Sequence, residues 1–166
     1  MPLSSACRPG CDPRKPLMKR VLTALMLATA LGCGEAAAFQ LTDTKGVVHT
    51  LAAYRGKWVL VNAWASWCAP CLAEMPELDG LARSHPDLIV LGLAVDGLDA
   101  RRVTQFAERL GVRYPMIAAD EAALRQFKLR AYPTSILYDR SGTAVLTKEG
   151  RITRQDVEAI IGGPSK

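Results

Sequence analysis

The sequence predicts an α/β fold in which a central mixed sheet carries helices on both faces. Two largely apolar runs of strand length, at 57–64 (KWVLVNAW) and 88–95 (LIVLGLAV), match strands that are buried on both sides of a sheet. Segments with the apolar spacing of amphipathic helices alternate with strands through the middle of the chain, which favours parallel pairing. The chain then ends in a predicted hairpin and a helix, so antiparallel strands join the parallel ones. With 166 residues, 49% of them hydrophobic, the chain suits one such domain.

The individual elements follow from local patterns along the chain. The first, at 39–50, is a short hairpin in which Gly46 supplies the turn, and 51–56 is expected to be a connector. Further strands are expected at 57–64, 88–95, 114–118, 134–138 and 143–147, and helices at 69–84, 100–110, 121–127 and 153–161. In the first helix, the residues expected to face the core are Leu72, Met75, Leu78 and Leu81. In the last helix they are Val157, Ile160 and Ile161.

Residues 1–38 have the organisation of a targeting segment, and residues 39–166 are expected to form the folded domain. Two basic residues, Lys19 and Arg20, precede an uncharged apolar run of 11 residues at 21–31. That length suits the apolar region of a secretory signal peptide and is short for a membrane-spanning helix, which needs about 20 residues.

Three fates of this leader stay open. Cleavage after the alanines at 36–38 would start the mature chain at Phe39. The sequence ALGC that ends at Cys33 resembles a bacterial lipobox, and a lipid on Cys33 would tether the domain to a membrane. A leader that is not cleaved would anchor the domain in the membrane. All three place the domain in the periplasm or at the extracytoplasmic face of a bacterial membrane; Met18, followed by KR and the apolar run, is an alternative start.

The positive charge of the chain is concentrated in the leader. The net charge is +5, and residues 1–38 hold five basic and two acidic side chains, so the rest of the chain carries only +2. No cluster of Lys and Arg occurs there, so no nucleic-acid partner is expected. We expect the domain to need no cofactor.

A single CxxC pair, Cys68 and Cys71, carries the chemistry. It follows a buried strand and opens a helix, whose N-terminus favours the thiolate of Cys68. Pro70 suits the first helical turn, and Cys71 should be more buried, where it can resolve a mixed disulfide formed by Cys68. Trp67 offers an apolar rim for a partner chain. The pattern predicts a redox-active pair.

Other interpretations of the pair are weaker. Half of a zinc site would need a second pair of ligands, and the body offers only His49 and His85, so no metal site is expected. A structural disulfide across two residues closes too small a loop to stabilise much. Two plain core thiols would not account for the strand before the pair and the helix after it.

The segment NAWASWCAPCLAEMP at 62–76 resembles the active-site segment of the thioredoxin superfamily, specifically of its exported TlpA/ResA-like branch. Together with Tyr132 and Pro133, which precede a threonine, the resemblance extends over 39–161 and implies a thioredoxin-like fold. It implies a cis peptide bond before Pro133, beside the cysteines, where the proline aligns a substrate backbone. Tyr132 and Trp67 are then further substrate-binding candidates.

Two more features match that branch. Pro76 should kink the active-site helix, because it removes an internal hydrogen bond. The stretch 96–114 exceeds plain thioredoxin by about a helix and a strand, as the insertion of this branch does.

One departure from plain thioredoxin concerns proton transfer. The buried Asp that precedes the first cysteine in thioredoxin is Asn62 here, which does not titrate. In the TlpA/ResA-like branch a Glu after the second cysteine has a similar role, and Glu74 stands at that position. Because Cys71 and Glu74 are three residues apart on a helix, they share a face. Glu74 is therefore a catalytic candidate, its alternative being a solvated surface residue, as we expect Glu77 to be.

The resemblance implies an extracytoplasmic thiol–disulfide oxidoreductase that reduces disulfides in partner proteins. Candidate substrates are the cysteines of apocytochrome c or oxidised metal-site cysteines, and a membrane thiol carrier would donate the electrons. An oxidant or isomerase is the first alternative, since direction depends on reduction potential. A copper-binding chaperone that adds His85 to the two thiolates is the second, and a peroxidase has less support.

Overall fold

The computed structural model describes residues 39–163, and its elements follow one another in the predicted order. The strands are β1 (Gln40–Thr42), β2 (Val48–Thr50), β3 (Trp58–Trp64), β4 (Leu88–Ala94), β5 (Met116–Ala118), β6 (Thr134–Tyr138) and β7 (Ala144–Glu149). The helices are α1 (Ala69–Ser84), α2 (Ala100–Arg109), α3 (Glu121–Arg125) and α4 (Arg154–Ile161), with a 3-10 turn at Ala52–Tyr54 inside the expected connector. The leader and its cleavage or lipidation sites lie outside the described residues. Within 39–163, no helix is both long enough and apolar enough to cross a membrane.

The central sheet is mixed, as predicted. Its five strands lie in the order β5-β4-β3-β6-β7. β3 pairs in parallel with β4, and β4 with β5, whereas β6 is antiparallel to both β3 and β7. β1 and β2 form a separate antiparallel hairpin. A helix, α2, and a strand, β5, stand between β4 and α3, where the resemblance implied an insertion.

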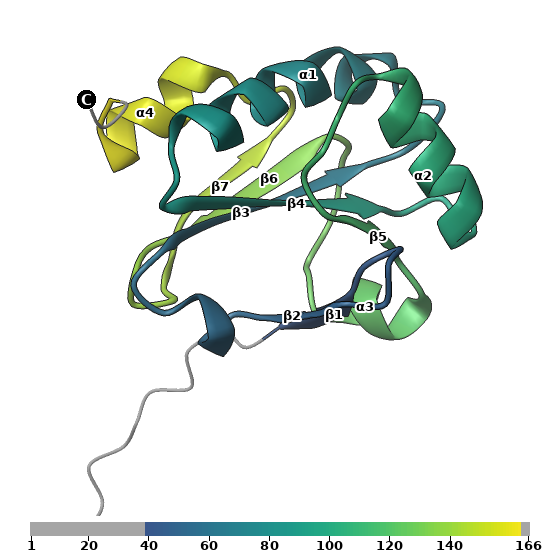
Figure 1. Ribbon diagram of the computed structural model, residues 1–166, viewed down its shortest axis with the longest axis horizontal. Coiled ribbons are helices and arrows are strands. Elements are labelled where there is room, and N and C mark those ends of the chain that lie inside the picture. Colours follow the sequence, from purple (N-terminus) through teal and green to yellow (C-terminus); the bar gives the residue numbers. More distant parts are fainter. Residues whose placement is uncertain (1–38, 164–166) are drawn as a thin grey trace, which may run out of the picture. The chain divides into compact units, whose positions relative to one another are not determined.

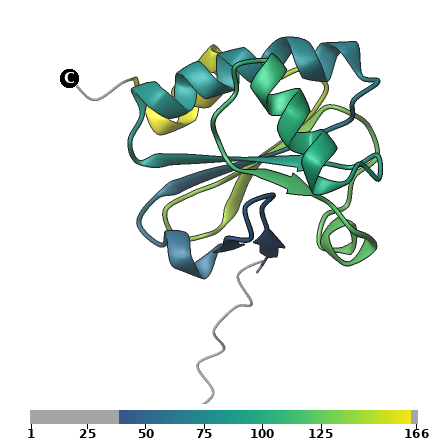
Figure 2. The ribbon, with the colours of Figure 1, turned by 45° about the vertical axis from the view of Figure 1, so that its right-hand side comes forward.

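Both faces of the sheet are covered, so the domain has two apolar clusters. α1, α2 and α4 lie over one face (Figure 1). The β1–β2 hairpin and α3 lie on the other, and Figure 2 shows the same separation from a second direction. On β3, Leu60 and Trp64 enter the first cluster, while Val59, Val61 and Ala63 enter the second. This explains why β3 is apolar at nearly every position instead of alternating.

The hairpin also covers one edge of the sheet. Asp43 Oδ1 accepts hydrogen bonds from the backbone N–H groups of Lys45 (2.8 Å) and Val47 (2.9 Å), which fixes the turn. The next residue, Thr44, donates its N–H to the carbonyl of Met116 on β5 at 2.8 Å. A turn that is distant in sequence therefore occupies part of the free edge of β5.

The inward face of α4 differs from the prediction. Val157 is fully buried, but Ile161 is only partly buried and Ile160 is 38% exposed. The expectation for Ile160 was therefore wrong. The helix has eight residues and packs against α1, so only a narrow stripe of its surface is covered. On α1, in contrast, Met75, Leu78 and Leu81 are completely buried, and Leu72 packs against the same cluster.

We predict that Gly92→Ala destabilises the domain by about 1–3 kcal/mol, because the central strand β4 has no room for a Cβ at that position. A Cβ there would collide with the sulfur of Met116 and lie 3.0 Å from Cε2 of Tyr114. Urea unfolding of the oxidised protein measures the loss. Gly80→Ala is the control. Its Cβ would lie 3.5 Å from Nη2 of Arg154, so the helical substitution should stabilise by about 0.5–1 kcal/mol. An unchanged midpoint for Gly92→Ala would show that the side chains of Met116 and Tyr114 can move aside at no cost.

Candidate active site

Cys68 and Cys71 form a disulfide at the N-terminus of α1. The sulfur atoms are 2.04 Å apart and the Cα atoms 5.3 Å apart. Cys68 is the N-cap of the helix, and Pro70 occupies the first turn, where a missing N–H breaks no internal bond. Cys68 is 5% exposed and Cys71 is completely buried, which is the order expected from the sequence.

The helix terminus places one backbone hydrogen-bond donor against the sulfur of Cys68. The backbone N–H of Cys71 donates to Sγ of Cys68 at 3.3 Å. When the disulfide is reduced, the same N–H and the positive end of the helix dipole favour the thiolate over the thiol. The more accessible sulfur is thus also the one whose ionised form the backbone stabilises.

A second loop approaches the cysteines from β6. The Tyr132–Pro133 peptide bond is cis, as the resemblance implied, and the carbonyl of Pro133 accepts a hydrogen bond from Gly150 at 2.8 Å. Tyr132 is 36% exposed and Trp67 is 71% exposed. Their rings meet edge to face, with centroids 6.2 Å apart. Two exposed aromatic side chains therefore connect the cysteine loop to the proline loop.

Glu74 lies inside the domain, one turn after Cys71. It is completely buried, so it is not a solvated helix residue. Its Oε1 accepts a hydrogen bond from Nδ2 of Asn62 at 2.8 Å, and its Oε2 accepts one from the backbone N–H of Ile152 at 2.8 Å. Burial raises the pKa of the Glu74 carboxyl, and these hydrogen bonds and the charge of Arg151 oppose that rise without cancelling it. Such a carboxyl can exchange a proton closer to neutral pH than an exposed glutamate.

Glu77 is not the free surface residue that the sequence suggested. It is only partly exposed, it pairs with Arg151 at 3.1 Å, and it accepts the backbone N–H of Arg154 at 3.0 Å. It therefore connects α1 to the start of α4. Because these partners lie more than 70 residues further along the chain, no local pattern could show them.

Sequence reasoning also missed a contact under the cysteine loop. Ser66 donates both its backbone N–H (2.8 Å) and its hydroxyl (2.6 Å) to Oδ2 of Asp96. Asp96 follows β4, which lies beside β3 with Ala94 opposite Trp64. The only available signal was that both residues follow parallel strands, whose carboxyl ends meet at one edge of the sheet. The contact attaches the loop before Cys68 to the neighbouring strand.

The histidines lie away from the cysteines. His85 caps the opposite end of the 16-residue helix α1, so a rise of about 1.5 Å per residue places it roughly 20 Å from Cys71. Its Nδ1 lies 3.1 Å from the Leu81 carbonyl. His49 lies on β2, bonded to Asp43. Among residues 39–163, no three His, Cys, Asp or Glu side chains gather as metal ligands. The helix geometry therefore contradicts His85 as a copper ligand beside the cysteines.

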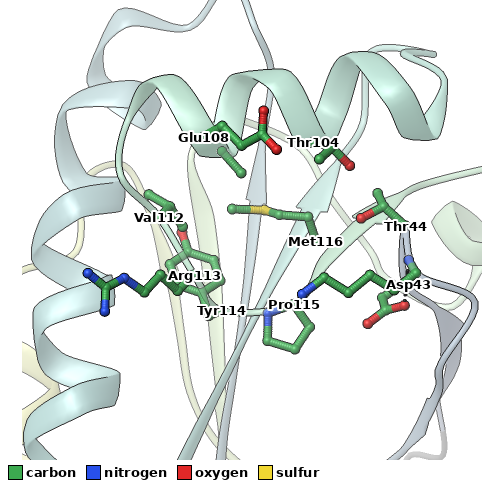
Figure 3. Close-up of a pocket in the computed structure, with 11 residues that line it drawn as sticks. Asp43, Thr44, Thr104, Glu108, Val112, Arg113, Tyr114, Pro115 and Met116 are labelled. Carbon is green, nitrogen blue, oxygen red and sulfur yellow. Dashed lines mark hydrogen bonds between the residues drawn. The ribbon is translucent and has the colours of Figure 1, made fainter.

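A cavity of about 280 Å³ lies on the flank of the domain, between α2, the turn of the hairpin and the strand β5. In Figure 3, Thr104 and Glu108 reach it from α2, Thr44 from the turn, and the Met116 side chain extends across its floor. Neither cysteine is among its lining residues, so it is separate from the redox pair.

The fold and this disulfide together define a thioredoxin-like protein of thiol–disulfide exchange. The AhpC/TSA family model matches residues 34–152, and the chain belongs to that family. A curated relative, the thiol-disulfide oxidoreductase ResA of Geobacillus kaustophilus, is 37% identical over 133 residues, which cover 78% of this chain and 76% of that protein.

Solved structures agree with this assignment. A thiol:disulfide interchange protein of the thioredoxin family from Chlorobium tepidum superposes with a TM-score of 0.67 at 25% identity, covering 75% of this chain and 90% of its own. The exposed lipoprotein thioredoxin Etrx1 of Streptococcus pneumoniae gives a TM-score of 0.62 at 27% identity. The match covers 74% of this chain and 96% of the Etrx1 chain. The chain is a thiol–disulfide oxidoreductase of the ResA type, with Cys68 and Cys71 as its CxxC pair. The fold class, the family resemblance and the enzyme class are confirmed.

Proposed function

We propose that the chain reduces disulfides in partner proteins outside the cytoplasm, with Cys68 as the attacking thiol. The observation that carries this proposal is the order of burial at the helix terminus. Cys68 at the N-cap keeps 5% of its surface exposed, Cys71 behind it has none, and a buried carboxyl lies one turn further on. Each of the three groups suits one step of the exchange.

In the first step, the Cys68 thiolate attacks a partner disulfide, forms a mixed disulfide and releases one partner sulfur as a thiolate. Cys71 then transfers its proton to the Glu74 carboxylate, and the Cys71 thiolate attacks Sγ of Cys68. The Cys68–Cys71 disulfide closes and the second partner sulfur leaves. Two electrons have moved to the partner, and a membrane thiol carrier would return two electrons to the pair.

The partner would lie across the two loops that flank the disulfide. Trp67 and Tyr132 offer an exposed aromatic surface, and Pro133 lies buried beside Tyr132 at the start of β6. We assign these three residues to substrate binding. The cysteines of apocytochrome c, or oxidised metal-site cysteines, are the substrates that the ResA-like resemblance favours. An oxidant or isomerase would use the same geometry in the other direction, because the reduction potential sets direction.

The leader would bring this chemistry to the outer face of a bacterial membrane. Residues 1–38 are its proposed boundary and 39–166 the domain. N-terminal sequencing of the mature protein is expected to begin at Phe39. An acylated N-terminal peptide that begins at Cys33, found in the membrane fraction by mass spectrometry, would instead show a lipoprotein, as the name of the pneumococcal relative states for that protein. A full-length product in the cytoplasm would refute export.

The roles of the two cysteines can be separated by trapping. Cys71→Ser is expected to accumulate mixed disulfides with partner proteins on non-reducing gels, because Cys68 still attacks and nothing resolves the product. Cys68→Ser should trap none, since the remaining thiol is completely buried. Equal trapping by both variants would contradict the assignment. The trapped partners should then accumulate in oxidised form in cells that lack the chain; accumulation of their reduced form would identify an oxidant.

The role of Glu74 is tested by its pH dependence. Glu74→Gln should slow resolution of the mixed disulfide by about 10²-fold, because the buried proton acceptor is lost. In the wild type the rate should rise as pH increases through the raised pKa of Glu74, and in the variant this rise should disappear. The pKa of Cys71 should fall, since a neighbouring negative charge has been removed.

A matched control must avoid Glu77, which pairs with Arg151. Glu108 is exposed on α2, so Glu108→Gln should change neither the pH dependence of mixed-disulfide resolution nor the pKa of Cys71. Wild-type kinetics for Glu74→Gln across the pH range would exclude this carboxyl from the proton path.

A further inference from the structure

The outer edge of β4 is paired over only part of its length. β5 pairs with the last residues of the strand, Gly92–Ala94. The residues before them, 88–91, have β3 on one side, and no strand of the described chain lies on the other. An edge of this kind carries backbone groups with which an extended chain can pair.

The alternation of hydrogen bonds along β4 identifies the unpaired groups. Gly92 donates its N–H to the carbonyl of Pro115, on the side of β5. Because successive residues of a strand direct their backbone groups to opposite neighbours, Val90 and Leu88 face the same side as Gly92. The N–H of Leu88 is used in a turn. The N–H and carbonyl of Val90 and the carbonyl of Leu88 form no hydrogen bond with any group in residues 39–163.

Pro115 explains why β5 does not continue along this edge. In the continued register Tyr114 would stand opposite Val90, and the carbonyl of Val90 would need an N–H from residue 115, which proline lacks. The backbone N–H of Arg113 is bonded instead to Oδ1 of Asp79 on α1 at 2.7 Å. The chain before β5 is thus held on α1, and this part of β4 is left open.

A groove of about 290 Å³ follows the open edge. Residues 88–90 all line it. Since the side chains of successive strand residues point to opposite faces of the sheet, a groove lined by all three runs along the edge itself. α1 forms one wall and Tyr54 of the 3-10 turn belongs to the other. The Tyr54 hydroxyl is hydrogen-bonded to Nδ1 of His49, and the two rings stack with centroids 6.0 Å apart, which fixes this wall.

The lining of the groove carries an excess of positive charge. Arg83 and Arg113 both contribute to it, against the single carboxylate of Asp79. Both oxygens of Asp79 are already used, Oδ2 by Nε of Arg83 at 2.9 Å and Oδ1 by the backbone of Arg113. Arg83 is still 61% exposed in this pair, and the guanidinium of Arg113 has no hydrogen bond or ion pair with another residue in 39–163. The groove therefore offers cations to a ligand and no free anion.

We propose that the open part of β4 binds an extended, acidic peptide segment of a partner protein. The segment takes the place of the missing part of β5, and its backbone pairs with the N–H and carbonyl of Val90. A carboxylate of the segment pairs with the guanidinium of Arg113. A second copy of this chain is disfavoured as the occupant, because symmetric pairing through this edge would bring the arginines of both copies together.

Access to the edge and distance from the disulfide both fit this role. Val90 is 2% exposed, so a segment reaches its backbone only through the groove, where the exposed side chain of Arg113 is free to move aside. Arg83 lies more than three helical turns beyond Cys71 on α1, roughly 18 Å along the axis. A segment bound in the groove therefore leaves the disulfide open to react.

The test begins with a cysteine-free library of short random peptides, displayed on phage and selected against the full-length oxidised protein. The enriched sequences should contain Asp or Glu, and synthetic versions of them should shift the NMR signal of the Val90 amide and slow its hydrogen exchange. Failure to enrich acidic sequences, or binding that leaves the Val90 amide unchanged, would overturn the proposal.

Pairing through the main chain has a signature of its own. Only every second residue of a bound strand directs its N–H to β4, so N-methylation of a selected peptide should abolish binding at alternate positions and be tolerated between them. Equal tolerance at all positions would mean that side chains alone are recognised, and strand addition would be refuted.

The charge of the partner is tested by Arg113→Gln, which removes the guanidinium and keeps the backbone N–H that Asp79 accepts. The dissociation constant of the selected peptides should rise about five- to tenfold at low salt, and less at high salt. Arg101→Gln is the matched control, because Arg101 is exposed on α2 and does not line the groove. An unchanged constant for Arg113→Gln would contradict an acidic partner.

These measurements do not depend on the proposed reduction of partner disulfides. The library contains no cysteine and the redox pair is closed in the oxidised protein, so exchange cannot capture a peptide. A chain that proved to be an oxidant would still bind the selected peptides, and a chain that bound none could still reduce disulfides.

Discussion

The carboxyl group of Glu74 is the constraint around which the site is arranged, because a fully buried carboxyl must be hydrogen-bonded wherever it lies. Its partners are Asn62 on β3, 12 residues before Glu74, and the backbone of Ile152 just before α4, 78 residues after it. The register of β3 against β6, the end of β7 and the start of α4 must all be correct for both oxygens to be satisfied. Because Glu74 lies one turn after Cys71, this requirement also fixes the rotation of α1 beneath the disulfide.

The loops around the cysteines are held from several sides. In the loop before Cys68, Asp96 accepts hydrogen bonds from the backbone N–H and the hydroxyl of Ser66. In the facing loop, the backbone N–H of Gly150 donates to the carbonyl of Pro133. At the surface, the aromatic rings of Trp67 and Tyr132 pack edge to face and so connect the two loops. Preorganisation of this kind lets a bound partner meet the sulfur without rearranging the backbone, which is how a rigid scaffold favours an exchange reaction.

Local patterns predicted most of the fold, and long-range pairing accounts for the rest. Helix α1 and strand β6 have the predicted bounds, because apolar spacing and the flanking turn residues determine both. The cysteine pair and the cis bond before Pro133 were likewise accessible from short motifs. The partners of Glu77 and the contact between Ser66 and Asp96 were not, since each depends on which strands become neighbours. Ile160 was misplaced for the same reason: the pattern shows an apolar residue, but the neighbouring elements decide whether it is covered.

The hydrogen bond from Thr44 to Met116 also limits how these molecules can associate. A sheet edge offers unpaired backbone groups to any extended chain, including another copy of the same protein. β5 has only three residues, and the turn of the hairpin already occupies one of its carbonyls. Strand addition at this edge would first have to displace the hairpin and open the apolar cluster beneath it. The turn of the β1–β2 hairpin therefore hinders the addition of another strand at the edge of β5.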